Sequence, residues 1–160
     1  MAAWLDKGDL TPKQALDIPP VWLLGFLVLA YAIGRVLPIM AQSYGPAKAL
    51  GALLIVAGVG LMVWALAVFR AHATSVVPHQ MPKRMITTGP FAISRNPIYL
   101  GDAMVLAGAS LWWGHGFALG LIPVFCAVIQ RRFIAPEEGR LKESFGDDFQ
   151  EYAQKTRRWA

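Results

Sequence analysis

Four apolar stretches dominate the chain, and they predict an all-α membrane protein. They cover about residues 21–38, 49–69, 98–113 and 117–130. The second carries no charge over about the length needed to cross a bilayer core. The first is interrupted by Arg35, close enough to its end for the side chain to reach the membrane surface. We therefore expect an integral helical bundle with four membrane segments.

The last two stretches are shorter than the others, and Gly114-His115-Gly116 separates them. Each holds about 15 residues, roughly 22 Å of helix, whereas a hydrocarbon core is about 30 Å thick. We expect a short hairpin here, sunk below one membrane surface or set in a thinned bilayer.

The tail 131–160 reads as a cytosolic amphipathic helix. Pro136 suits a first helical turn, and Glu137-Glu138 would lie beside the positive end of the helix dipole. One apolar face follows at three- and four-residue steps, with a break expected at Gly146. This face comprises Leu141, Phe145, Phe149 and Tyr152. With this tail, residues 1–160 form a single predicted domain.

Charge distribution orients the predicted segments. Hydrophobic residues make up 56% of the chain and charged residues 16%, against about a quarter in soluble domains. Four crossings would place thirteen Lys and Arg on one side and two on the other. The two are Arg35 and Lys48; the thirteen are Lys7, Lys13, Arg70, Lys83, Arg84, Arg95, Arg131, Arg132, Arg140, Lys142, Lys155, Arg157 and Arg158. This bias predicts a cell (inner) membrane protein with both termini cytoplasmic.

The same basic face accounts for the net charge of +5 and favours membrane lipids over nucleic acid as partners. The mixed charges before residue 18 lack the pattern of a cleaved signal peptide. A lone Cys126 and the scattered His72, His79 and His115 predict no metal site. We find no glycine fingerprint of a Rossmann dinucleotide site. The sequence does not predict the oligomeric state.

Two motifs flank the predicted hairpin. Gly89-Pro90-Phe91, Arg95-Asn96-Pro97, Tyr99 and Gly101 precede or enter its first arm, and Pro136-Glu137-Glu138, Leu141 and Phe145-Gly146 follow its second. Together they resemble the paired C-terminal motifs of the isoprenylcysteine carboxyl methyltransferase and phospholipid methyltransferase family. Its members are membrane-embedded and use S-adenosylmethionine (SAM). The resemblance covers roughly residues 74–158.

The resemblance implies a SAM pocket built from both motifs. Its residues would be Met85, Ile86, Phe91, Asn96, Pro97, Ile98, Tyr99, Glu137 and Glu138. A glutamate carboxylate could face the cationic sulfonium, and Asn96 and Tyr99 could supply hydrogen bonds and an aromatic wall. Local physics offers another account: Asn96-Pro97 is a good helix start, and Glu137-Glu138 are good first-turn residues.

Three further residues are candidates for the acceptor side. In isoprenylcysteine members an arginine before the acidic pair handles the acceptor's carboxylate; Arg131 and Arg132 lie nearby, but Phe133 occupies the expected position. Asp102 is an intramembrane carboxylate, suited either to the acceptor or to an ion pair with Arg95 or Arg131. Gly58 and Gly60 could match a Gly-x-Gly of phospholipid-type members, but close helix packing by small residues is the favoured explanation.

The predicted function is SAM-dependent methyl transfer to a small or lipophilic thiol, amine or carboxylate at the cytoplasmic face. One alternative is a sterol- or steroid-type membrane reductase with a nicotinamide cofactor. Another is a small four-helix multidrug-type transporter, although the first segment lacks the membrane carboxylate that such proteins need.

Overall fold

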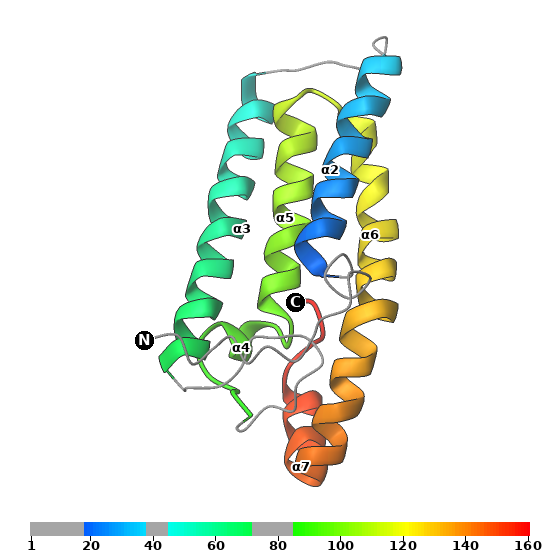
Figure 1. The fold of residues 1–160 in the computed structure, drawn as a ribbon. Coiled ribbons are helices and arrows are strands. Elements are labelled where there is room, and N and C mark those ends of the chain that lie inside the picture. The colour runs from blue at the N-terminus through cyan, green and yellow to red at the C-terminus, as the bar shows by residue number, and fades with distance from the viewer. Residues whose placement is uncertain (1–17, 38–44, 72–84) are drawn as a thin grey trace, which may run out of the picture.

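A computed structural model describes residues 18–37, 45–71 and 85–160. In this part of the chain every regular element is helical, which confirms the predicted all-α class. The elements are α2 (Pro19–Val36), α3 (Gly45–Ala71), α4 (Pro90–Ile93), α5 (Pro97–Trp112), η2 (Gly116–Gly120), α6 (Leu121–Ile129), η3 (Gln130–Ile134) and α7 (Ala135–Lys155). The long helices run alternately up and down, and α4, α7 and the C-terminus gather at one end of the bundle (Figure 1).

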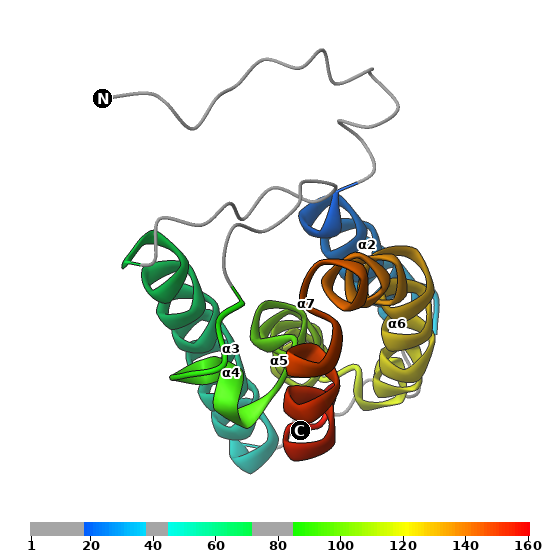
Figure 2. The same ribbon diagram turned by 90° about the horizontal axis from the view of Figure 1, so that it is seen from below.

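Three helices are long and apolar enough to cross a membrane: Pro19–Val36, Gly45–Ala71, and the continuous helical run Gly116–Lys155. The 16-residue α5 is shorter, about 24 Å long, yet lies between α3 and the pair α2 and α6 (Figure 2). Four crossings therefore remain a prediction. Of the charges behind the predicted orientation, Lys7, Lys13, Lys83 and Arg84 lie outside the described residues, as do His72 and His79.

Glycines bring α3 and α5 into close contact. A Cβ atom added at Gly51 would lie 2.6 Å from the carbonyl oxygen of Gly108, and one at Gly58 would lie 2.7 Å from that of Gly101. Along α3, Gly51 and Gly58 are seven residues apart, and so are Gly101 and Gly108 along α5. A spacing of seven places both glycines on the same face of their helix. Small residues allow this backbone approach in membranes. Gly58 is thus a packing residue, whereas a Cβ at Gly60 would meet nothing within 4 Å.

On the other side of α5, the main core joins α2, α5 and α6. Leu106, Phe125 and Ile129 are fully buried there, and the rings of Phe26 and Phe125 meet edge to face at 5.3 Å. Such packing fixes α6 relative to α5, and α6 leads directly into the helix that carries the second motif.

The hairpin turn at the far end of the bundle follows the predicted position. Gly114 has φ of 77°, a conformation that glycine adopts without a Cβ penalty. The next residue, His115, is buried against α2, because a Cβ at Gly34 would come within 2.1 Å of its ring. The turn is therefore locked to α2, at the opposite end from both motifs.

The second arm of the hairpin differs from the expectation. It does not stop at Gln130: helical backbone continues through the π-helix η3 into α7, which begins at Ala135 with Pro136 in its first turn. The amide of Ala135 bonds to the carbonyl of Gln130, five residues back. A proline lacks an N–H and its ring clashes with the carbonyl four residues earlier, so a wider turn accommodates Pro136. Consequently Glu137 and Glu138 do not sit at a free helix N-terminus, and the dipole explanation is wrong.

The amphipathic character of α7 is confirmed. Phe149 and Tyr152 are buried and Leu141 and Phe145 are partly buried, while most residues between them are exposed. The helix is interrupted at Gly146, where φ of 51° and ψ of −117° are non-helical. This kink folds the second half of α7 back towards α4.

Candidate functional site

The first motif is anchored on α3 by apolar packing. Gly89, with φ of 63°, turns the chain into the short helix α4. The ring of Phe91 meets that of Phe69 edge to face at 5.0 Å, and Ile86 and Ile98 join the same cluster around the buried Ala65. Three residues implied by the family pocket, Ile86, Phe91 and Ile98, therefore hold the motif in place. Met85 lies partly buried just before them.

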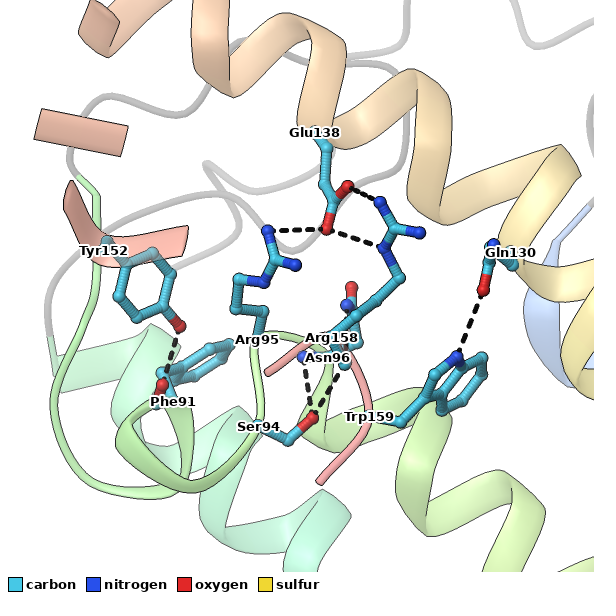
Figure 3. Close-up of polar contacts among 9 residues, drawn as sticks. All are labelled: Phe91, Ser94, Arg95, Asn96, Gln130, Glu138, Tyr152, Arg158 and Trp159. Carbon is cyan, nitrogen blue, oxygen red and sulfur yellow. Dashed lines mark hydrogen bonds and ion pairs between the residues drawn. The ribbon is translucent and has the colours of Figure 1, made fainter. Parts of the chain in front are cut away.

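The second half of α7 is tied to this anchored segment. The Tyr152 hydroxyl donates a hydrogen bond of 2.6 Å to the carbonyl of Phe91 (Figure 3). Tyr152 is buried, and burial raises the pKa of its phenol to about 12. The hydroxyl therefore keeps its proton at physiological pH and remains a donor.

Asn96 occupies the N-cap position of α5, but its side chain makes no capping hydrogen bond. Its amide instead donates to the main-chain carbonyl of Arg158 over 3.0 Å, and the Ser94 hydroxyl donates to the same oxygen over 3.1 Å. Pro97 follows as a buried first-turn residue. The helix-start explanation thus fits Pro97, whereas the Asn96 side chain holds the C-terminus.

Glu138 forms the charged centre of the site. Its carboxylate is 3.1 Å from Nη1 of Arg95 and accepts two hydrogen bonds from the guanidinium of Arg158. Figure 3 shows both arginines converging on Glu138 from the opposite wall of the site. One carboxylate therefore joins the first motif, the second motif and the C-terminus.

Glu137, the neighbouring residue, faces α5. The Tyr99 hydroxyl lies 3.5 Å from Oε2 of Glu137, and the Tyr99 and Phe133 ring centroids are 6.4 Å apart. The carboxylate of Asp102 and the guanidinium of Arg140 lie near enough to act electrostatically on Tyr99. Two acidic and two aromatic side chains thus meet between α5 and the η3–α7 helix.

Glu137 lies in α7, beyond the apolar stretch that ends at Ile129. Burial raises the pKa of its carboxyl above the ordinary value of 4.5; Arg140 and the Tyr99 hydrogen bond oppose the rise, and Glu138 adds to it. Glu137 is partly buried, and a carboxylate that has lost much of its water and whose charge is incompletely balanced attracts a cationic group. Such a position suits the binding of a positively charged cofactor or acceptor.

The acceptor-side candidates are only partly brought together. Asp102 is 4% exposed and lies one turn from Tyr99, but Arg95, one of its two predicted ion-pair partners, binds Glu138 instead. Arg131 is exposed, and the guanidinium of Arg132 lies 5.1 Å from the ring centre of Trp22 on α2. Asp102 therefore belongs to the cluster, whereas Arg132 is directed towards α2.

Sequence reasoning missed the contribution of the C-terminal end. Ser94, Gln130, Arg158 and Trp159 all take part, the last through a hydrogen bond of 3.3 Å from its indole to the Gln130 side chain. Arg157-Arg158-Trp159 looks like a solvated basic end, and three of the hydrogen bonds that fix it are accepted by the main-chain carbonyls of Arg157 and Arg158. No side-chain pattern could have indicated them.

Comparison with known proteins places these observations in a family. A 63-residue stretch is 43% identical to an uncharacterized protein of Haemophilus influenzae; it covers 39% of this chain and 98% of that protein. No solved structure matches significantly. The profile of the family described as phospholipid methyltransferase matches residues 46–148, from α3 through the kink of α7. This match covers more than half of the chain and includes both motifs, so the protein belongs to the phospholipid methyltransferase family of membrane proteins.

Proposed function

We propose that the protein transfers a methyl group from SAM to the amino group of a lipid-like acceptor. The observation that carries this proposal is the contact between Tyr99 and Glu137, which joins the two family motifs. The family supports methyl transfer to a lipid-like substrate. The position of the contact, at the end of the bundle where α4, α7 and the C-terminus gather, supports a reaction at the membrane surface (Figure 1).

The residues around Tyr99 fit the chemistry of SAM. The cofactor supplies a methyl group on a positively charged sulfonium. The carboxylate of Glu137 can face that charge, and the rings of Tyr99 and Phe133 can line the apolar part of the pocket. Tyr99 and Glu137 are partly buried, which limits the access of water and so strengthens their electrostatic contacts with a bound ligand.

An amine suits this site better than a carboxylate acceptor. Glu137 and Asp102 would repel a carboxylate, and Arg132, proposed to bind one, contacts Trp22 instead. An acceptor that arrives as an ammonium is attracted by the same two carboxylates. It must lose a proton before its nitrogen lone pair can attack, and either carboxylate can accept that proton.

The transfer balances in charge. In such a transfer the new bond from nitrogen to the methyl carbon would replace the bond from that carbon to sulfur, whose electron pair would stay on sulfur. Positive charge thus moves from sulfur to nitrogen. Glu137 and Asp102 both lie beside Tyr99, so a ligand bound there would have a carboxylate close to its positive charge before and after the transfer.

The charge distribution of the chain supports an inner-membrane protein with both termini in the cytoplasm.

A nicotinamide-dependent reductase is the alternative enzyme. Its phosphate-bearing cofactor needs available cations, but Arg95 and Arg158 both bind Glu138. Two arginines of the site are thus already engaged by a carboxylate.

Binding of labelled SAM and of NADPH to the purified protein tests the proposal. We expect saturable SAM binding that excess NADPH does not displace. A second assay supplies vesicles that contain an ethanolamine headgroup, with glycerol-headgroup vesicles as the control. Methyl incorporation into the first alone supports an amine acceptor. Absence of SAM binding would reject the methyltransferase, and incorporation into neither lipid would reject the lipid amine.

A further inference from the structure

The five residues that follow α7 leave the helix in an extended conformation at Thr156. We call Thr156–Ala160 the C-terminal strap. Thr156 is buried and Arg158 and Trp159 are partly buried, whereas the Arg157 side chain is exposed. The strap is therefore seated in the protein, although it lies at the chain end, where segments are poorly ordered unless they are tied down.

The strap is fastened to both sides of the interface between α5 and the η3–α7 helix. On the α5 side, the amide of Arg95 donates to the carbonyl of Arg157 over 2.9 Å, and Ser94 and Asn96 donate to the carbonyl of Arg158. On the other side, Arg158 binds Glu138 and Trp159 binds Gln130 (Figure 3).

The Tyr99–Glu137 contact bridges the same interface beside the strap. Tyr99 lies one turn after Asn96 on α5, and Glu137 adjoins Glu138 on α7. Trp159 packs against the same apolar cluster as Tyr99 and Phe133. A SAM molecule bound at Tyr99 and Glu137 would therefore lie next to the seated strap.

The fastenings differ in their exposure to water. The main-chain carbonyls of the strap are held by donors that are buried or nearly so. The Arg158 side chain, in contrast, is 35% exposed, so water competes for its contact with Glu138. Because water reaches the guanidinium, this contact can break and re-form without leaving a buried polar group unpaired. Arg158 is thus the water-accessible fastening that joins the strap to the second motif.

From these contacts we propose that the C-terminal strap is a movable cover over the Tyr99–Glu137 site. Release of Arg158 from Glu138 opens it, and SAM and its demethylated product exchange while it is open. The proposal rests on the proposed function, because it takes SAM as the molecule that exchanges. No covalent step is involved.

Rapid-mixing measurements of labelled SAM binding to the full-length protein test the cover. In Arg158→Ala we expect the association and dissociation rate constants both to rise about fivefold to tenfold, with Kd changed by no more than about twofold. Arg157→Ala is the matched control: it removes the same charge one residue away, from an exposed side chain. Both of its rate constants should stay within about twofold of the wild type.

A second variant, Arg158→Lys, keeps the charge but loses the two-point contact with Glu138, and should fall between the two. Unchanged rates in a folded Arg158→Ala protein that binds SAM would overturn the cover. Faster dissociation alone would also overturn it, because the strap would then be a fixed wall of the site. If no variant binds SAM, the proposed function fails and the cover fails with it.

Discussion

The side-chain amide of Asn96 donates a hydrogen bond to the main-chain carbonyl of Arg158, 62 residues later in the chain. This contact replaces the capping role that Asn96-Pro97 suggests. It ties the start of α5 to the C-terminus and places a family-motif residue in a fixed, polar interface. The amide has to be a donor here, which an acidic or shorter side chain cannot provide.

Asn96→Asp and Asn96→Ser test this role. Both residues cap helices well, so both should be nearly silent if Asn96 were only a cap. Asp lacks the donor and would set a carboxylate against the Arg158 carbonyl; Ser is too short to reach it. We expect each to lower the free energy of unfolding by about 1–3 kcal/mol. Thermal melting in detergent measures this, and unchanged melting would contradict the assignment.

Glu137→Gln should weaken SAM binding while the protein stays folded. A charge-assisted contact contributes about 1.5–3 kcal/mol, so the loss of affinity should be about tenfold to a hundredfold. Titration calorimetry beside thermal melting separates binding from stability. SAM affinity equal to that of the wild type would remove Glu137 from the site.

The pH dependence of Glu137 provides a separate test. Because burial raises its pKa, the native state holds this proton at a pH where the unfolded state has released it. Its contribution to stability is therefore most favourable below the ordinary pKa of 4.5 and decreases as the pH rises through the raised value. SAM affinity should change in the opposite direction, increasing with pH as the carboxylate ionises. Glu137→Gln should abolish this component of both trends, as melting and calorimetry from pH 5 to pH 8 would reveal.

Tyr99→Phe removes only the hydroxyl that faces Glu137, whereas Tyr99→Ala also removes the aromatic wall. The 3.5 Å hydrogen bond is long, so we expect Tyr99→Phe to cost about 0.5 kcal/mol of binding. Tyr99→Ala should cost several times more. Calorimetric titration with SAM gives both values, and an equal loss in the two variants would show that the ring makes no contribution.

Gly58 and Gly60 form a matched pair on α3. A Cβ at Gly58 would come within 2.7 Å of the Gly101 carbonyl, so Gly58→Ala should destabilise the bundle by about 1–3 kcal/mol. Gly60→Ala meets open space and adds a better helix former, so its melting temperature should be unchanged or higher. Equal effects of the two substitutions would contradict the packing of α3 on α5.

Much of the fold follows from patterns that depend on one helix at a time. The apolar stretches, the Gly114 turn, the amphipathic face of α7 and the break at Gly146 were all predictable, because each reflects local periodicity or a backbone angle. The end of the second arm was not. Charge at Arg131 and Arg132 and a proline at position 136 suggest a stop, but a π-turn lets the helix pass through both.

The candidate site, like the fold, was only partly predictable from the sequence. Tyr99 and Glu137 were predicted from the paired motifs and meet between α5 and α7. Asn96 and Glu138 were predicted as cofactor residues, yet their side chains bind the C-terminus. Sequence cannot reveal this, since the partners include a main-chain carbonyl 62 residues away and depend on how α7 folds back at Gly146.

The π-turn at Gln130–Ile134 also determines the direction in which Glu137 and Glu138 point. A π-turn holds about one residue more than an α-turn, and each residue rotates a helix by about 100°. If the same residues formed α-turns only, Glu137 and Glu138 would point to a different side of the helix. The number of residues between Gly116 and Glu137 therefore determines both how far along the helix Glu137 lies and in which direction it points. Removal of one residue from this segment would convert it to a regular α-helix and leave the acidic pair directed at α5, so the extra residue sets the chain length and the π-turn restores the direction.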